Sequence, residues 1–210
     1  MRRIAGFILT FMLMGLAGCS YLQGYVDIAK DKGLSGKYLK ALKYWTRTQT
    51  VYSQFETQVR LSATLRNRDF NGAYLEEYGR VYALTADEKK QRAALQADLA
   101  SGYTEFFVYV YTPEKETNDF DRYNSIWKVF LLDGRGNRID PFEVRRIGKV
   151  TPVMQEFFPY VNPYYGVCYT IKFPGPAAAG GQSAENKSPH EEPVRLVFTS
   201  VLARVELQWP

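Results

Sequence analysis

Apolar and polar residues alternate along several short stretches of this chain, the pattern of β-strands that bury one face. The clearest stretch is 55–65, where every second residue from Val59 onward is apolar and the residues between are polar. Other stretches rich in β-branched and aromatic residues, bounded by glycine or proline, also predict strands. They are 44–52, 103–111, 126–132, 142–150, 165–173, 194–200 and 202–209.

After the second strand the apolar period changes to the spacing of a helix. One helix is predicted over 69–84, with a shared face formed by Phe70, Tyr74, Tyr78 and Val81. Residues 85–88 match a capping box, in which Thr85 and Glu88 bond each other's backbone, and predict a second helix over 85–100. Its apolar stripe is narrow, so we expect this helix on the surface.

These elements predict an α+β fold that is mainly β. We expect a seven- to eight-stranded antiparallel sandwich, immunoglobulin-like, with two helices (69–100) inserted between the second and third strands. Residues 133–137 predict a hairpin turn, and the Pro/Gly/Ala/Ser-rich stretch 174–193 predicts a mobile loop. The expected core comprises Val59, Leu61, Leu65, Val129, Leu131, Val167, Tyr169, Ile171, Leu196, Phe198 and Leu207.

The first twenty residues have a different pattern. Arg2 and Arg3 precede an apolar run of 13 residues, 4–16. A membrane-spanning helix needs about 20 apolar residues, so the run predicts an export signal over 1–18 and not a permanent span. The run ends in Leu16-Ala17-Gly18-Cys19, which resembles the lipobox of bacterial lipoproteins. The alternative is a plain secretory signal with a chance cysteine.

The resemblance implies that the chain is cut before Cys19 and that this cysteine carries fatty acyl chains such as palmitate. It also implies a cell-envelope location. In lipoproteins of this kind, aspartate directly after the acylated cysteine is the signal for retention in the inner membrane. This chain has Ser20 there, so the resemblance implies the periplasmic face of the outer membrane if the cell is Gram-negative. Residues 19–42 are then expected to be a lipidated tether, and 43–210 a single β-sandwich domain.

Charge and composition exclude some classes of function. The chain has 27 Lys and Arg against 22 Asp and Glu, and no large basic cluster, so nucleic-acid binding is not expected. A hydrophobic fraction of 46% and an aromatic fraction of 15% are typical of a folded globule. With Cys19 lipidated, Cys168 has no disulfide partner in the chain and is expected to be a buried filler.

Signatures of catalysis are weak. The only histidine, His190, lies in the predicted mobile loop, which rarely holds an imidazole for a catalytic triad. One histidine and one free thiol cannot supply a zinc site. Acidic residues in the helices and in the loop around Asp119 and Asp121 are expected to be solvated, since the ligand pattern for calcium is incomplete. No catalytic residue, metal or cofactor is therefore expected.

One aromatic stretch is a candidate binding surface. It carries five rings within nine residues, namely Phe157, Phe158, Tyr160, Tyr164 and Tyr165. Exposed rings would stack on sugars or on a protein partner, whereas buried rings would seal one end of the sandwich. We favour the second interpretation, in which the rings are buried and close one end of the sandwich.

Three functions remain open at the level of the sequence. The favoured one is a lipid-anchored, non-catalytic module that binds another envelope protein or assembles with it. The second is a carbohydrate- or cell-wall-binding module that uses the aromatic stretch. The third is a small hydrolase with paired carboxylates, which a cleft holding two convergent carboxylates would support.

Overall fold

The structure is a computed structural model that describes residues 33–100, 102–175 and 193–210. The chain divides into the units Met1–Leu34 and Ser35–Pro210, and the second contains every helix and strand described. The helices are α2 (Gly36–Trp45), α3 (Arg68–Val81), α4 (Ala86–Ala100), α5 (Pro152–Phe157) and the 3-10 turn η1 (Lys115–Thr117). The strands are β1 (Thr46–Ser53), β2 (Glu56–Leu65), β3 (Tyr103–Tyr111), β4 (Lys128–Leu132), β5 (Arg138–Ile139), β6 (Glu143–Arg146), β7 (Val167–Pro174), β8 (Val194–Thr199) and β9 (Arg204–Trp209).

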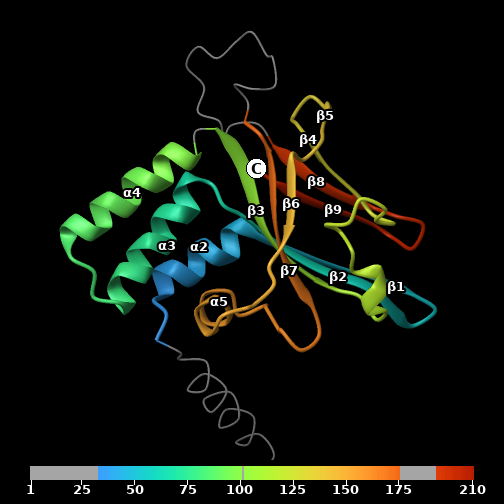
Figure 1. Cartoon of the computed structure of the whole chain (residues 1–210), viewed down its shortest axis with the longest axis horizontal. Coiled ribbons are helices and arrows are strands. Elements are labelled where there is room, and N and C mark those ends of the chain that lie inside the picture. Colours follow the sequence, from blue (N-terminus) through green and yellow to red (C-terminus); the bar gives the residue numbers. More distant parts are fainter. Residues whose placement is uncertain (1–32, 101, 176–192) are drawn as a thin grey trace, which may run out of the picture. The chain divides into compact units, whose positions relative to one another are not determined.

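Two sheets form the β part of the unit (Figure 1). One has the strand order β1-β2-β3-β7-β6 and the other β5-β4-β8-β9, and all described pairs are antiparallel. The predicted α+β class with mainly antiparallel sheets is therefore confirmed. Eight strands were expected, and the additional one is β5, which follows the turn at 133–137 and pairs with β4. It has two residues, too few to show an alternation of apolar and polar positions.

The main core lies between the two sheets. Phe106 of β3 meets Trp209 of β9 at 5.0 Å between ring centroids, and Phe120 meets Phe198 of β8 at 5.7 Å. Ten of the eleven predicted core residues are buried. The exception is Val167, which is half-buried because it opens β7 at the end of the sandwich.

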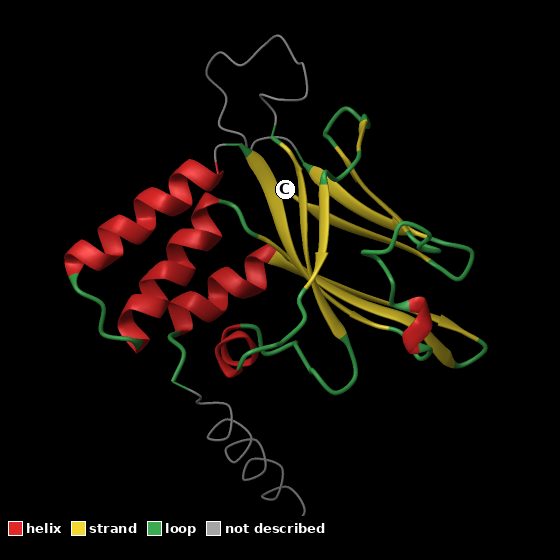
Figure 2. Ribbon diagram, viewed as in Figure 1, coloured by secondary structure: helices red, strands yellow, loops and turns green. Residues whose placement is uncertain are grey.

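The other face of the five-stranded sheet is covered by helices (Figure 2). Here the sequence-based expectation was wrong: the polar face of β2 was expected to meet water, but Ser62 and Thr64 are buried. Their hydroxyls bond those of Thr48 and Thr46 on β1 at 2.8 and 2.7 Å. Burial is tolerated because each hydroxyl has a hydrogen-bond partner.

The folded unit also begins earlier than the expected boundary at 42–43. Ser35 caps α2, its hydroxyl accepting a hydrogen bond from the Tyr38 backbone N–H at 3.2 Å. Tyr38, Leu42 and Trp45 are buried along one face of α2. A tether over 19–42 is therefore wrong at its C-terminal end, because α2 docks through these apolar side chains.

The helices α3 and α4 follow β2 and precede β3 in the chain. The capping box at the start of α4 is confirmed, since the Thr85 backbone donates to Glu88 Oε2 at 2.8 Å and Glu88 N–H donates to Thr85 Oγ1 at 3.3 Å. The described side chains of α4 are exposed or half-buried, as expected. The predicted signal peptide and most of the predicted loop 174–193 lie outside the described residues.

Candidate functional site

The structure divides the predicted aromatic surface into two parts. Phe157 and Phe158 are buried, and Tyr160 is half-buried with its hydroxyl 2.7 Å from that of Thr64. Tyr164 and Tyr165 are exposed. The five rings therefore do not form one continuous surface, because α5 turns the first two towards the sheet.

The buried rings belong to a second, aromatic core between the helices and the five-stranded sheet. Phe158 lies 4.3 Å from Phe107 of β3, measured between ring centroids. Tyr38 of α2 lies 5.5 Å from the Phe157 ring and donates its hydroxyl to the Phe157 carbonyl at 2.8 Å. Burial raises the pKa of Tyr38 far above its ordinary value. This core fixes α2, α3 and α5 relative to the sheet.

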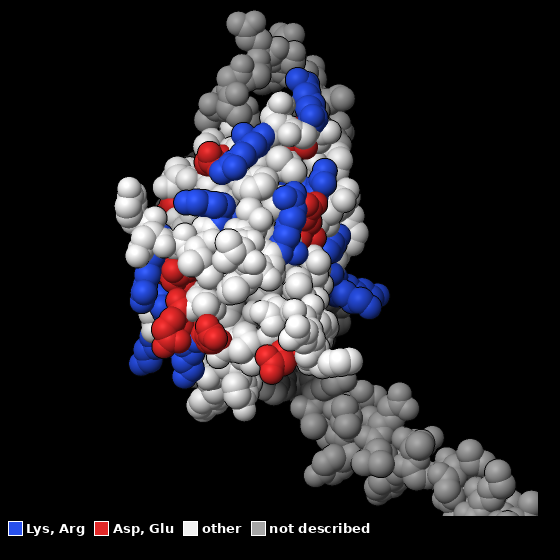
Figure 3. All heavy atoms as spheres, turned by 90° about the vertical axis from the view of Figure 1, so that its right-hand side faces the viewer, with Lys and Arg blue, Asp and Glu red and all other residues white. Residues whose placement is uncertain are grey.

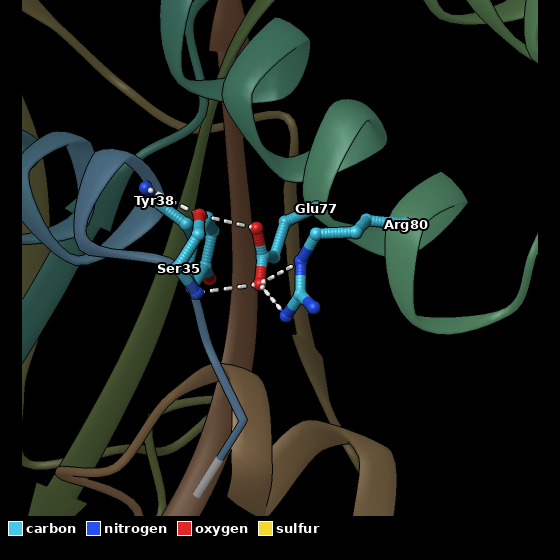
Figure 4. A network of polar contacts seen from close by, with 4 residues as sticks. All are labelled: Ser35, Tyr38, Glu77 and Arg80. Carbon is cyan, nitrogen blue, oxygen red and sulfur yellow. Dashed lines mark hydrogen bonds and ion pairs between the residues drawn. The ribbon is translucent and has the colours of Figure 1, made fainter. Parts of the chain in front are cut away.

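A buried carboxylate, Glu77 of α3, ties the start of α2 to this layer (Figure 4). The Ser35 backbone N–H donates to Glu77 Oε1 at 2.7 Å, and the Ser35 hydroxyl donates to Oε2. Arg80, one turn further along α3, donates to Oε1 from Nη2 at 2.6 Å. We call Ser35, Glu77 and Arg80 the Glu77 clamp.

Hydrogen bonds within the Glu77 clamp keep the Glu77 carboxylate ionised. The Glu77 side chain is 3% exposed, and burial alone would raise its pKa. Hydrogen bonds from Arg80 and Ser35 outweigh burial and lower the pKa of Glu77 to about 2. A carboxylate so firmly ionised is a poor general acid at neutral pH. The clamp instead holds the point where the chain enters the folded unit.

A shallow groove of about 300 Å³ lies between α3 and α4. Its lining residues are Tyr74, Leu75, Tyr78, Arg92, Leu95 and Gln96. The Arg92 guanidinium lies 5.2 Å from the centre of the Tyr78 ring, and the Tyr74 and Tyr78 rings are stacked at 6.2 Å. Tyrosine and arginine, together with tryptophan, are enriched in protein-binding hot spots. We call this site the α3–α4 groove.

Sequence analysis did not identify the α3–α4 groove. The apolar spacing placed Tyr74 and Tyr78 on one helix face and α4 on the surface, without bringing the two helices together. The tyrosines at four-residue spacing, Tyr74, Tyr78 and Tyr82, were the available signal.

Other polar candidates have structural roles. Asp133 accepts hydrogen bonds from the backbones of Arg135 and Asn137 at 2.9 and 2.8 Å, so its carboxylate holds the hairpin turn. Asp119 accepts the Ser125 hydroxyl at 2.8 Å. Burial raises the pKa of the Cys168 thiol to about 12, which keeps it protonated and unreactive. His190 and Cys19 lie outside the described residues.

Within 33–100, 102–175 and 193–210, no group of three or more His, Cys, Asp or Glu side chains is placed to hold a metal ion. No helix in these ranges has the length and apolarity needed to cross a bilayer.

The fold and site define an α+β protein whose two antiparallel sheets are flanked by helices that form a shallow groove rich in tyrosine. No family model matches the chain, and neither the curated proteins nor the solved structures contain a match.

Proposed function

We propose that this protein is a lipid-anchored lipoprotein of the cell envelope that acts as a non-catalytic protein-binding or assembly module. The observation that carries the binding role is the α3–α4 groove. Its aromatic and leucine side chains suit an apolar side chain of a partner, while Arg92 and Gln96 suit a carboxylate or carbonyl beside it. The partner is thus a protein segment that combines an apolar and an acidic residue.

The anchor is the lipid proposed for Cys19, in Leu16-Ala17-Gly18-Cys19 after an apolar run of 13 residues. One acyl chain binds a membrane only marginally, whereas two or more hold a protein firmly. The Glu77 clamp fixes the start of α2 at Ser35, where a tether from Cys19 would join the folded unit. The location proposed is the periplasmic face of the outer membrane in a Gram-negative cell.

The non-catalytic role is supported by the structural contacts of two carboxylates and a thiol that could otherwise be reactive. The carboxylates of Glu77 and Asp133 bind donors of the fold itself, and the Cys168 thiol is buried. These two carboxylates therefore hold a helix start and a turn, and this thiol lies in the core, so none of the three is presented in a cleft.

Site-specific photocrosslinking in intact cells tests the binding role. A photoreactive phenylalanine analogue at Leu95, in the groove, should give a discrete adduct with one partner protein. The same analogue at exposed Gln208 on β9 is the control. Tyr78→Ala and Arg92→Glu should each abolish the Leu95 adduct without changing protein abundance. Equal adducts from both positions would contradict the proposed groove.

The anchor is tested separately. Cys19→Ala should leave the protein unprocessed or released from the membrane, while Cys168→Ala, which removes the other thiol, should leave processing unchanged. A Cys19→Ala protein that is still cut after Gly18 and still membrane-bound would exclude lipidation at this cysteine.

A second candidate function is carbohydrate or cell-wall binding through Tyr164 and Tyr165. Both side chains are exposed, which favours stacking on sugar rings. Sedimentation with purified cell-wall polysaccharide tests this function: Tyr164→Ala with Tyr165→Ala should abolish pelleting. Pelleting unchanged by this double substitution would exclude these two rings.

We further propose a specific type of sandwich for this fold. An immunoglobulin-like sandwich with 69–100 as an inserted helical pair is supported by the two-layer, antiparallel arrangement and by the chain order β2-α3-α4-β3.

A further inference from the structure

Exposed apolar side chains gather at one end of the sandwich, on three loops. Tyr52 and Phe55 belong to the β1–β2 hairpin, Val201 and Leu202 to the β8–β9 hairpin, and Tyr123 and Ile126 to the loop before β4. Phe55 and Tyr123 are fully exposed, and Val201 is 93% exposed. We call these six residues the hairpin end. Figure 3 views this side of the molecule and shows uncharged atoms across its middle, between groups of charged residues.

Strand register brings the three loops together. Arg47 Nε of β1 donates to the Gln208 carbonyl of β9 at 2.8 Å, and the Glu206 N–H donates to Gln49 Oε1 at 3.3 Å. The two strands therefore run antiparallel, and both hairpin tips lie on the same side of the molecule (Figure 1). Lys128 pairs with Thr199, so the residues just before β4 flank the β8–β9 hairpin.

The β1–β2 turn has an unfavourable sequence for its backbone. Ser53 pairs with Glu56, so Gln54 and Phe55 alone form the turn, with φ angles of 48° and 70°. Two-residue turns with both φ values positive strongly favour Asn-Gly, and a bulky aromatic residue there is an outlier. Folding alone does not explain a phenylalanine that is strained and fully exposed. Strain of this kind is concentrated at functional sites.

Several backbone polar groups of the β8–β9 hairpin are paired within the turn. Ser200 Oγ accepts the N–H groups of Leu202 and Ala203 at 3.0 and 3.2 Å, and Ser200 N–H donates to the Ala203 carbonyl at 2.9 Å. Backbone groups that enter an apolar medium must be paired internally. The turn can therefore leave water without losing hydrogen bonds at these positions.

We propose that the hairpin end inserts into the interface of a lipid bilayer. Tyrosine rings favour the boundary between headgroups and acyl chains, and Phe55, Val201 and Leu202 supply apolar side chains below it. The side chains stand on projecting tips, and a fluid bilayer accommodates such a shape without a complementary pocket. A protein pocket or a second copy of this chain is the competing occupant.

The charges beside the hairpin end set how it binds. Exposed Arg122 and Lys128 flank Tyr123 and Ile126, while exposed Glu56 follows Phe55. Arg204, after the β8–β9 turn, is paired with Glu206 at 2.7 Å. Because both signs are present, insertion depends on apolar burial and should change little with salt.

The proposed anchor permits this contact. Residues 20–34, between Cys19 and Ser35, span at most about 55 Å when extended. From Ser35 the chain reaches the β1–β2 turn through α2, about 15 Å long with 10 residues, and β1, about 27 Å long with 8 residues, so the two points lie at most about 42 Å apart. A lipid on Cys19 and the hairpin end can therefore reach the same bilayer. The proposal does not depend on acylation, because its test measures the depth of the hairpin residues themselves.

Tryptophan fluorescence of the full chain in vesicles tests insertion. The protein is purified in detergent and reconstituted into phosphatidylethanolamine–phosphatidylglycerol vesicles with and without brominated acyl chains. Phe55→Trp is compared with Phe142→Trp, a matched substitution at an exposed position before β6, and wild type supplies the baseline because Trp45, Trp127 and Trp209 are buried. Val201→Trp is a second reporter if Phe55→Trp disturbs the turn.

If the hairpin end inserts, the tryptophan emission of Phe55→Trp and Val201→Trp should shift to the blue and be strongly quenched by brominated lipid. Both effects should persist in high salt. Phe142→Trp should show neither effect. Emission from both hairpin reporters that matches Phe142→Trp would overturn the proposal and leave a protein pocket as the occupant. A blue shift that depends on protein concentration and resists bromolipid quenching would also overturn it, in favour of a second copy of the chain.

Discussion

The Trp209 indole N–H donates to the Trp45 carbonyl at 2.7 Å, joining residues 164 positions apart. Trp209 ends β9 in the smaller sheet, and Trp45 is the last residue of α2. The bond satisfies one of the carbonyls that a helix C-terminus leaves unpaired. It therefore connects the helical layer with the sheet on the far side of the sandwich.

Replacing Trp209 with phenylalanine should destabilise the protein. The substitution keeps most of the packing against Phe106 but leaves the Trp45 carbonyl unpaired in a buried site, which costs about 1 to 3 kcal/mol. Urea unfolding followed by circular dichroism measures this loss. Tyr44→Phe, at an exposed neighbouring position, should stay within about 0.5 kcal/mol. Equal stability of Trp209→Phe and wild type would show that the hydrogen bond contributes nothing.

The Glu77 clamp should make stability depend on pH in the acid range. The pKa of Glu77 is lowered from 4.5 to about 2 in the folded state, so the unfolded chain binds the proton more readily. The contribution is therefore complete above pH 4.5 and is lost as pH falls towards 2. Because Arg80 is half-exposed, we expect about 1 to 3 kcal/mol.

Glu77→Gln measures that contribution directly. Its free energy of unfolding should be lower than that of wild type at pH 7 and should vary less between pH 4.5 and 2. Glu76→Gln, on the same helix but 65% exposed, is the control and should keep the wild-type profile. A parallel profile for Glu77→Gln and wild type would rule out the clamp as the source.

The sheet core should be far more sensitive to truncation than α4. Ile171 is completely buried in β7, so Ile171→Ala should cost about 2 to 5 kcal/mol. Gln91 is exposed on α4, so Gln91→Ala should stay within about 0.5 kcal/mol. Both values come from the midpoint and slope of chemical unfolding. Similar costs at the two positions would contradict the burial in the structure.

The β1–β2 turn should become more stable with the sequence that its backbone favours. Gln54→Asn combined with Phe55→Gly matches the two positive φ angles and should raise stability by about 1 kcal/mol. The same double variant should lose bilayer insertion, because the Phe55 ring is gone. Thermal unfolding measures the first effect, and a decrease in melting temperature would mean that the native turn carries no strain.

Local patterns predicted most individual elements. Strand β3 has the predicted boundaries 103–111, and the capping box begins α4 where Thr85 and Glu88 indicated. In both cases the signal lies within one element, in residue spacing or in a bond between neighbours. The pattern was less informative for α2, whose last residue, Trp45, lies within the stretch 44–52 that was predicted as a strand.

The sequence alone was sufficient for the strand-rich class, the inner face of the sandwich and the expectation of a lipid anchor at Cys19. Each depends on short-range order: period two, period three to four, or a tetrapeptide. Tertiary structure decided that the hydroxyl face of β2 is buried, since only the docked helices and Tyr160 remove water from Thr64. It also decided the α3–α4 groove, because the groove depends on how α4 packs back against α3. The hairpin end likewise needs the tertiary structure, because it joins loops from segments distant in the chain. Which segments meet depends on the strand order and register of the sheets. The sequence pattern does not specify them, because the alternation of apolar and polar residues within one strand is the same whichever neighbour the strand pairs with.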